Sequence, residues 1–313
     1  MIKRPPNYWR NLVLFTLCVV TLAMGGTTLW LAYSRAMLLV HPARNLAERT
    51  PSAVGIAQWE EVEFRASDGV HLRGWFIPPQ SHYRAVIIFV HGLATNRAHL
   101  LDEAALLTRH GYGALLFDLR NHGTSEGSLT TFGYLEIEDV RGAVEYLRAR
   151  TDVDAQRIAL MGHSLGAGTV LRAGARIEQV RAVIAVSAYA SLEENIVEGV
   201  EALTGLPAFP FAPLVIWFGE RETGLNLREV RPIDDIPHIS PRAVMLIHGQ
   251  EDSLIPVRNA YHLYQAAREP RELYVIPHAG HVGLLSAAPR EYEERVTAFL
   301  RRALSTEPTR PAR

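Results

Sequence analysis

Hydrophobic residues fall into one long N-terminal block, followed by short apolar runs separated by stretches of mixed polarity. The block at residues 11–34 contains no charged side chain. A helix rises about 1.5 Å per residue, so a helix of this length crosses a hydrocarbon core of about 30 Å. Trp9 lies at one end of the block and Trp30 and Tyr33 lie at the other, where interfacial aromatics belong. The pattern predicts a transmembrane helix over residues 11–34.

A cleaved signal peptide is the alternative interpretation of this block. Ala32 and Ser34 offer small residues around Tyr33, as a cleavage site requires. The apolar run is longer than the roughly 7–15-residue core of a signal peptide, and we therefore favour an anchor over a cleaved leader.

Basic residues near the block set its expected orientation. Lys3, Arg4 and Arg10 precede it, together with the terminal amine, whereas Arg35 is the first basic residue after it. Basic residues favour the cytoplasmic side of a membrane. We therefore expect residues 1–10 in the cytoplasm and the large domain on the extracytoplasmic side.

From about residue 58, short apolar runs alternate with stretches of helical periodicity. Strands are predicted at residues 59–66, 70–77, 85–90, 113–119, 157–161, 182–187, 243–248 and 272–276. Helices are predicted at residues 97–110, 134–150, 165–176, 257–268 and 290–304. The first two strands are joined by Ser67-Asp68-Gly69, which is a hairpin signal. The alternation predicts an α/β fold with a mostly parallel eight-stranded sheet flanked by helices.

Three stretches lie outside this alternation. Residues 35–57 have little periodicity and predict a connector, which leaves residues 58–304 as the folded domain. Residues 191–240 are rich in proline and aromatic residues without a clear strand, and they predict a cap insertion. A packed surface excursion is the alternative for that segment. Residues 305–313 predict a disordered tail.

Composition narrows the function classes. The 313 residues hold 32 Lys and Arg against 33 Asp and Glu, and we see no basic stripe or nucleic-acid motif, so no nucleic-acid partner is expected. Cys18 is the single cysteine, which excludes an internal disulfide framework and a cysteine-built metal site. There is no His-Glu-x-x-His pattern. We therefore expect no metal and no other cofactor.

Ser164 is the candidate nucleophile. It lies between Gly162 and Gly166, where a predicted strand ends and a predicted helix begins. A serine on so sharp a turn needs small neighbours, and its hydroxyl projects above the strand ends. The pattern Gly-x-Ser-x-Gly also occurs by chance, so an ordinary turn serine is the alternative until partners are found.

A serine hydroxyl attacks efficiently when a histidine takes its proton and an acid holds that histidine. Asp252 and His281 each follow a predicted strand, and functional residues gather beyond the carboxyl ends of strands in such sheets. Glu251 and His278 are the rivals for these two roles. Gly280 lets the backbone turn inward before His281, which favours this histidine.

The oxyanion of the reaction needs hydrogen-bond donors, and removing one donor typically costs about 3 kcal/mol of transition-state stabilisation. The main-chain N–H groups of Leu93, after His91-Gly92, and of Leu165, after Ser164, are the candidates. We expect most other histidines to be structural or exposed, with two or three lining the site: His91, His99, His110, His122, His163, His238, His248 and His262.

These motifs resemble those of serine hydrolases of the α/β-hydrolase superfamily, and they are similar to its serine-aminopeptidase-like and prolyl-oligopeptidase-like single-domain group. The matching segments span about residues 60–300: His91-Gly92-Leu93, residues 118–127, Gly162-His163-Ser164-Leu165-Gly166, residues 248–252 with Ile255-Pro256, and Gly280-His281. The resemblance implies nucleophile Ser164, acid Asp252, base His281, oxyanion donors Leu93 and Leu165, and structural positions at Asp118 and Asn121.

The expected reaction is hydrolysis of a carboxylic ester or thioester through an acyl-serine intermediate. A serine aminopeptidase or amidase is one alternative, and a non-catalytic scaffold that keeps the fold is another. Apolar aromatics in the predicted cap favour an apolar acyl group, with the membrane nearby: Phe209, Phe211, Trp217 and Phe218. The alternative is that these four side chains only fix the cap to the sheet.

Overall fold

The structure of the protein, a computed structural model, describes residues 6–204 and 206–305. Part of the predicted cytoplasmic terminus (residues 1–5) and most of the predicted disordered tail (residues 306–313) lie outside the described residues.

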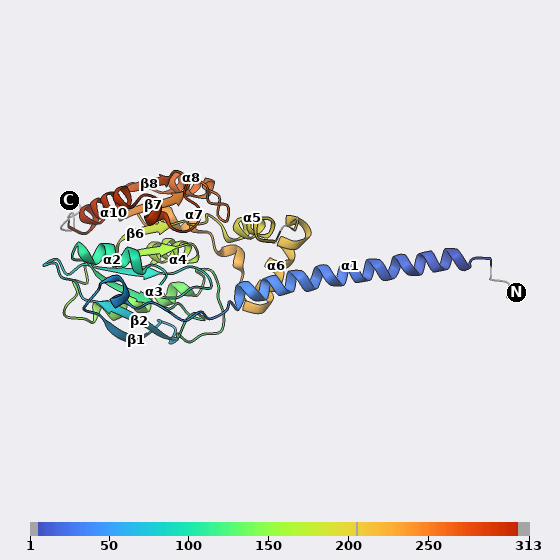
Figure 1. The fold of residues 1–313 in the computed structure, drawn as a ribbon, viewed down its shortest axis with the longest axis horizontal. Helices are drawn as coiled ribbons and strands as arrows, with labels where there is room; N and C mark the ends of the chain where they lie inside the picture. The colour runs from blue at the N-terminus through green and yellow to red at the C-terminus, as the bar shows by residue number, and fades with distance from the viewer. Residues whose placement is uncertain (1–5, 205, 306–313) are drawn as a thin grey trace.

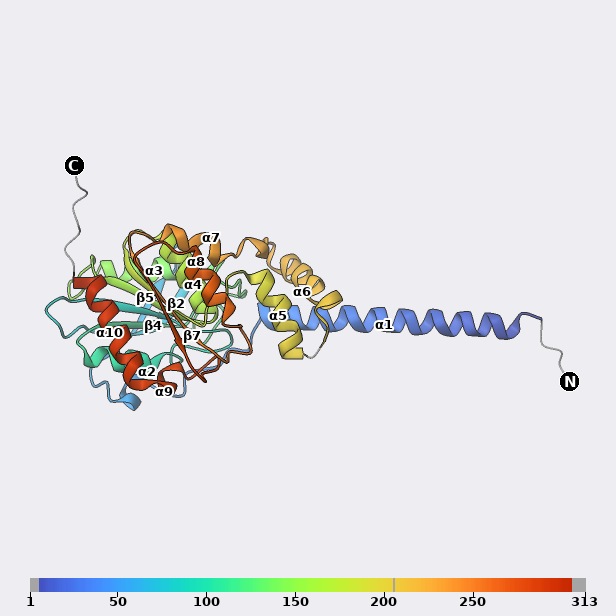
Figure 2. The same cartoon turned by 90° about the horizontal axis from the view of Figure 1, so that it is seen from above.

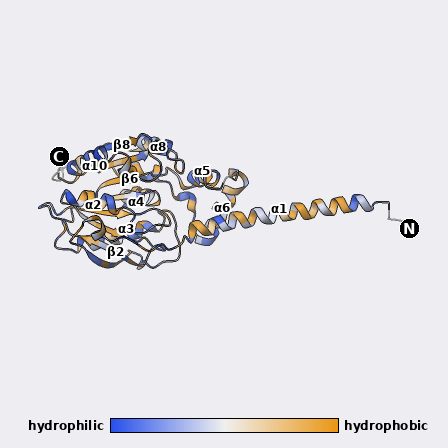
Figure 3. Cartoon of the chain, in the orientation of Figure 1, coloured by the Kyte–Doolittle hydropathy of each residue, from blue (hydrophilic) through white to orange (hydrophobic). Residues whose placement is uncertain are grey.

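A single long helix leaves the globular body at the N-terminal end. Helix α1 (Tyr8–Val40) runs away from the rest of the molecule in both views (Figures 1 and 2). Much of it is hydrophobic (Figure 3), and among the described residues it is the one helix long and apolar enough to cross a bilayer. It continues beyond residues 11–34, so the first part of the predicted connector is helical. The helix ends before His41 because Pro42 follows, and a residue that precedes proline disfavours helical dihedrals.

Eight strands form one sheet: β1 (Glu60–Arg65), β2 (His71–Ile77), β3 (Val86–Val90), β4 (Gly113–Phe117), β5 (Ile158–His163), β6 (Val180–Val186), β7 (Ala243–Gly249) and β8 (Arg271–Ile276). Their spatial order is β1-β2-β4-β3-β5-β6-β7-β8. The β1–β2 and β2–β4 pairs are antiparallel, and all other pairs are parallel. The predicted mostly parallel eight-stranded sheet is therefore confirmed.

Helices cover both faces of the sheet. Their bounds are α2 (Leu101–Arg109), α3 (Glu136–Arg148), α4 (Leu165–Arg176), α8 (Arg258–Ala266), α9 (Leu284–Ala287) and α10 (Pro289–Ser305), with a 3-10 turn η1 (Pro51–Val54) before β1. Helices α3, α4 and α8 share one hydrophobic core, and α2 and α10 share the other. Because both faces are covered, every residue of β3, β4 and β5 is buried.

Helix α2 begins later than the predicted helix at residues 97–110. Asn96 Oδ1 accepts a hydrogen bond from the Ala98 N–H at 2.9 Å, and the Arg97 N–H donates to Asp118 Oδ1 at 2.7 Å. Such side-chain bonds compete with the helical hydrogen-bond pattern and delay the helix to Leu101.

The described part of the predicted cap, residues 191–204 and 206–240, is largely helical. It contains α5 (Leu192–Thr204) and α6 (Ala208–Thr223), followed by η2 (Leu227–Glu229), α7 (Pro232–Asp235) and η3 (Ile236–His238). Helices α5 and α6 project from the body on the side from which α1 leaves (Figures 1 and 2). Helix α6 packs along the last turns of α1, where Ala32, Ala36 and Val40 are buried. The Tyr33 ring meets the Phe218 ring edge to face, with 5.4 Å between centroids.

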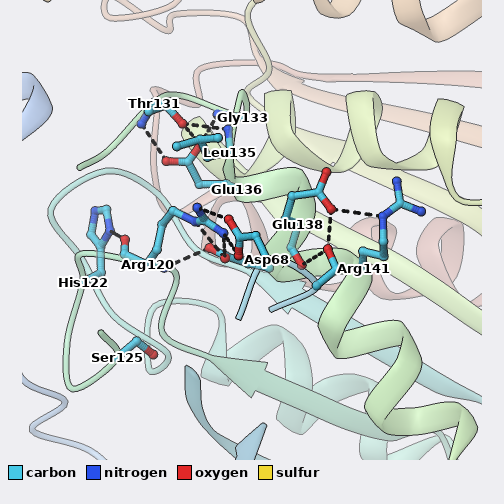
Figure 4. Close-up of polar contacts among 12 residues, drawn as sticks. Asp68, Arg120, His122, Ser125, Thr131, Gly133, Leu135, Glu136, Glu138 and Arg141 are labelled. Carbon is cyan, nitrogen blue, oxygen red and sulfur yellow. Dashed lines mark hydrogen bonds and ion pairs between the residues drawn. The ribbon is translucent and has the colours of Figure 1, made fainter. Parts of the chain in front are cut away.

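A buried arginine fixes the loop after β4. Arg120 donates to both carboxylate oxygens of Asp68, in the β1–β2 turn, at 2.8 and 2.9 Å (Figure 4). It also donates to Asp139 of α3 at 2.7 Å. Beside it, the carboxylate of Glu136 accepts the main-chain N–H of Thr131 at 2.7 Å (Figure 4). These paired charges hold the loop against the hairpin and α3.

Candidate active site

The turn between β5 and α4 holds Ser164 in a left-handed conformation, with φ 57° and ψ −116°. A non-glycine residue at such dihedrals is strained, and the strain persists only where the surroundings enforce it. The Ser164 N–H donates to the Val186 oxygen at 2.9 Å. A Cβ atom on Gly162 would collide with the Gly166 oxygen, and one on Gly166 would collide with the Val90 oxygen. The close approach of strand and helix therefore requires glycine at both positions.

Three of the predicted residues come together beyond the ends of β5, β7 and β8. His281 Nε2 lies 3.0 Å from Ser164 Oγ, and His281 Nδ1 lies 2.8 Å from Asp252 Oδ2. An ionised carboxylate has only acceptors, so Nδ1 carries the ring proton and Nε2 is left to accept the serine hydroxyl. This arrangement allows His281 to take the Ser164 proton.

Asp252 is held as an anion. Burial alone would raise the pKa of Asp252, but hydrogen bonds from His248 and His281 outweigh it and keep that pKa well below its usual value. Its Oδ1 accepts the main-chain N–H groups of Leu254 and Ile255 at 2.9 and 2.8 Å. The carboxylate is therefore both ionised at neutral pH and fixed in orientation.

The rival acid and the rival histidine pair with each other. His278 Nδ1 lies 2.9 Å from Glu251 Oε1, and the side chains are 88% and 62% exposed. In contrast, the side chain of Asp252 is fully buried and that of His281 is 14% exposed. The structure thus brings Asp252 and His281 to Ser164 and leaves the rival pair at the surface.

Leu93 and Leu165, the predicted donors, line the same cavity as Ser164. In the described parts of the chain, neither main-chain N–H has a hydrogen-bond acceptor. Leu165 is the first residue of α4, and the first N–H groups of a helix have no partner within it. Both N–H groups are therefore available to an oxygen bound beside Ser164.

Two further histidines, His99 and His163, line the cavity. Burial lowers the pKa of His99 to about 4 and that of His163 to about 3, so both are neutral at pH 7. His163 Nε2 donates to the main-chain oxygen of His281 at 2.8 Å. His99 and His163 both belong to the set of histidines of which two or three were expected to line the site, but the contact of His163 with the backbone of His281 was not predicted.

Two buried histidines have structural contacts. The ring of His91 accepts the Leu119 N–H at 3.0 Å, and the ring of His122 accepts the Ala94 N–H at 3.2 Å. Within the described ranges, no group of three His, Cys, Asp or Glu side chains is placed to hold a metal ion.

The cavity beside Ser164 has a volume of about 390 Å³. Part of its wall comes from the cap and from α1, and this part is largely apolar: Leu39, Ile196, Gly199, Val200 and Val215. Among the described residues of the cap and α1, Arg35 and Asn195 are the polar ones that line the cavity. The site therefore joins an apolar chamber to the serine.

The aromatic residues of the cap do not line this cavity, contrary to the prediction from the sequence. Phe209 and Trp217 are 79% and 47% exposed. Phe211 is buried in the core, and Phe218 packs on Tyr33 of α1. The prediction was wrong because α6 turns its aliphatic face, not its aromatic one, toward the serine.

The sheet order and the geometry around Ser164 are those of a hydrolase fold. The model of the alpha/beta hydrolase family matches residues 87–295, and the chain belongs to this family. The uncharacterized protein YfhR of Escherichia coli strain K12 is 32% identical over 256 residues, which cover 79% of this chain and 82% of that one. The uncharacterized protein YqkD of Bacillus subtilis strain 168 is 30% identical over 234 residues, which cover 74% and 76%.

Solved structures share the fold. The esterase Pf2001 of Pyrococcus furiosus superposes with a TM-score of 0.73 and 28% identity, covering 85% of this chain and 98% of the esterase. The acylaminoacyl peptidase of Pyrococcus horikoshii superposes with a TM-score of 0.63 and 21% identity, covering 82% of this chain and 43% of the peptidase. The second likeness shows the fold alone. The family and the esterase neighbour together support a hydrolase.

Proposed function

We propose that the protein is a serine hydrolase that cleaves carboxylic ester or thioester bonds through an acyl-Ser164 intermediate. The observation that carries the proposal is the hydrogen-bonded chain from Ser164 Oγ through His281 to Asp252, with distances of 3.0 and 2.8 Å. The likeness to an esterase at 28% identity favours ester over amide bonds.

The reaction follows from the direction of these hydrogen bonds. Ser164 Oγ bonds to the carbonyl carbon of the substrate while its proton passes to His281 Nε2. The imidazolium then gives this proton to the departing alcohol or thiol, and the acyl group stays on Ser164. A water molecule deprotonated by His281 attacks the acyl-serine, and the acid leaves as Oγ regains a proton. Asp252 stabilises the imidazolium in both halves.

The negative charge on the carbonyl oxygen needs donors that are already oriented. We assign this role to the N–H groups of Leu93 and Leu165, which line the cavity with Ser164 and have no acceptor in the described residues. His99 and His163 are neutral at pH 7, so neither of these two imidazoles supplies a positive charge to the oxyanion. The oxyanion is stabilised by the dipoles of the two N–H groups.

An apolar acyl group suits the chamber. Ile196, Val200 and Val215 line it, and burying an unpaired charge against such a wall is costly. We therefore propose that the acyl chain of the substrate lies against the cap.

The N-terminal helix is proposed to be a retained single-pass anchor. Cleavage after Ser34 would remove Ala32 and Tyr33, yet Ala32 is fully buried and the Tyr33 ring packs on Phe218 of the cap. A helix that packs into the domain is better suited to staying than to being removed. The bias of basic residues favours a cytoplasmic N-terminus and an extracytoplasmic domain. Recovery of the unprocessed chain in the soluble fraction after detergent-free lysis would overturn the anchor.

Covalent labelling tests the proposed activity. The full-length protein in detergent is expected to react with a fluorophosphonate probe, and the label is expected to disappear in Ser164→Ala. Absence of labelling of the folded wild type would instead favour a non-catalytic scaffold. Faster hydrolysis of p-nitrophenyl acyl esters than of aminoacyl nitroanilides is expected, and the reverse order would favour an aminopeptidase or amidase.

A further inference from the structure

The proposed membrane helix also forms part of the pocket wall. Arg35 and Leu39 of α1 line the cavity that contains Ser164. Their side of the helix is held in place by α6, since Ala32, Ala36 and Val40 are buried. A simple tether has no need to contact the site, so α1 has a second role.

Arg35 supplies a positive charge to this lining. Among the described residues that line the cavity there is no aspartate or glutamate, and Arg35 is the one arginine or lysine. No carboxylate of the described residues lies within ion-pair distance of its guanidinium. A guanidinium that is exposed at a pocket wall without a partner is a binding group for phosphate or carboxylate.

A second polar group of the wall also lacks a partner. Asn195 Oδ1 is buried, and within the described residues it accepts no hydrogen bond. A buried acceptor without a donor is unfavourable, so a hydroxyl or N–H group of a bound ligand would satisfy it. The wall contributed by α1 and the cap thus offers one cation and one acceptor beside an aliphatic chamber.

The position of Arg35 along α1 indicates where such a ligand comes from. Arg35 is the first charged residue after the uncharged block at residues 11–34, and Trp30 and Tyr33 lie shortly before it. If this block spans the bilayer, Arg35 lies at the membrane surface, at the depth of lipid head groups. The cap lies on the same side of the body as α1 (Figures 1 and 2).

We infer that the substrate is an anionic, single-chain amphiphile from the bilayer, with its anionic group bound by Arg35 and its acyl ester carbonyl at Ser164. The volume of about 390 Å³ is near the lower end of the roughly 300–1,000 Å³ of small-molecule pockets, which suits one acyl chain and not two. This inference rests on the proposed esterase function and specifies its substrate class.

The experiment compares two lipids with the same acyl chain in neutral detergent micelles. Palmitoyl lysophosphatidylglycerol carries an anionic phosphate, whereas monopalmitoylglycerol is neutral. The full-length wild type is expected to hydrolyse the anionic lipid with the higher kcat/KM. Arg35→Gln is expected to lower the ratio of anionic to neutral kcat/KM by about tenfold, the usual scale of a charge-assisted hydrogen bond, and Arg35→Lys is expected to restore part of it.

Arg221→Gln is the matched control, because Arg221 is an exposed arginine of α6 that does not line the cavity. It should leave the ratio unchanged, whereas an equal fall in both arginine variants would mean general attraction of anionic micelles. An equal fall in both variants, or an unchanged ratio in Arg35→Gln, would overturn the assignment of Arg35.

Equal kcat/KM for palmitoyl and water-soluble hexanoyl lysophosphatidylglycerol would overturn the bilayer origin of the substrate. If the wild type hydrolyses none of these esters, the result would instead refute the proposed function itself.

Discussion

His163 Nε2 donates a hydrogen bond of 2.8 Å to the main-chain oxygen of His281, so the residue before the candidate nucleophile holds the backbone of the candidate base. The Ser187 hydroxyl donates to the same oxygen at 3.1 Å. The last residue of β5 and the residue that follows β6 therefore fix the loop that carries His281. This contact links the position of the serine turn to that of the imidazole.

We expect His163→Leu to lower kcat for ester hydrolysis by about tenfold with a smaller change in KM, because a small displacement of a catalytic group lowers the rate of the chemical step. Ser187→Ala should have a similar but weaker effect. His278→Leu, a change of an exposed histidine in the same loop, is the control and should leave kcat near the wild-type value. Steady-state kinetics on a p-nitrophenyl ester measure all three, and a drop in His278→Leu equal to that in His163→Leu would contradict the positioning role.

Asp252→Asn is expected to reduce kcat by about 10³–10⁴-fold, the scale seen when the acid of such a triad becomes an amide. The amide can donate to Nδ1, which moves the ring proton to Nε2 and removes the acceptor for the Ser164 hydroxyl. Glu251→Gln should retain activity, since Glu251 is exposed and pairs with His278. Comparable losses in the two variants, with both proteins folded by circular dichroism, would argue against Asp252 as the acid.

The cap wall is expected to set the preference for chain length. Ile196→Ala should lower kcat/KM more for p-nitrophenyl octanoate than for p-nitrophenyl acetate. The difference between the two losses should correspond to up to about 1–3 kcal/mol of transition-state free energy, the scale of a lost apolar contact. Trp217→Ala changes a half-exposed side chain outside the cavity and should affect both esters equally. Equal losses for both esters in Ile196→Ala would show that this side chain supports the fold alone.

Arg120→Met is expected to destabilise the domain by about 3–5 kcal/mol, because it leaves the carboxylate of Asp139 buried without its cation. The matched control is Arg141→Met, which removes the partly exposed ion pair with Glu138 shown in Figure 4 and should change the stability by less than about 1 kcal/mol. Thermal unfolding in detergent gives both values. Similar melting temperatures for the two variants would contradict the assigned role of Arg120.

Ionisation of the Glu103 carboxyl should lower the free energy of unfolding of the domain as the pH rises. Burial raises the pKa of Glu103 to about 7, above the value of about 4.3 in an unfolded chain. The folded state therefore binds the proton more tightly, and the stability this provides is lost as the pH increases from about 4 through 7.

Glu103→Gln, which is neutral at every pH, should thus raise the melting temperature at pH 8 by an amount that vanishes near pH 4. Glu145→Gln, a change of an exposed acid on α3, serves as the control. A stabilisation by Glu103→Gln that is the same at both pH values would exclude titration of Glu103 as the cause.

The sheet was predictable because its signals are local. β3 is a continuous apolar run because helices cover both faces of the sheet, and the turn Ser67-Asp68-Gly69 marks the β1–β2 hairpin. The helix predicted at residues 165–176 matches α4, since small residues and helical periodicity coincide there. Such patterns are set by backbone dihedrals and by which faces are buried, and both can be inferred from neighbouring residues.

The grouping of Ser164, Asp252 and His281 was also predictable, because a parallel sheet gathers the residues that follow its strands at one edge. The structure places His281 beside Ser164 with its side chain 14% exposed, whereas the side chain of His278 is 88% exposed and pairs with Glu251. The hydrogen bond from His163 to the main-chain oxygen of His281 had no signal in the sequence, since it depends on how two loops meet.

Tertiary packing decided which side chains of the cap face the cavity. Periodicity indicates that a helix forms, but it does not say which face of that helix a distant segment will cover. The packing of α6 on α1 turned Phe218 toward Tyr33 and left Trp217 half-exposed, while Ile196 and Val215 came to face the cavity. The same contact brought Arg35 to the pocket wall, although its sequence neighbours suggest only a membrane boundary. Packing between segments far apart in the chain depends on the shapes of both surfaces, and no local pattern of residues contains that information.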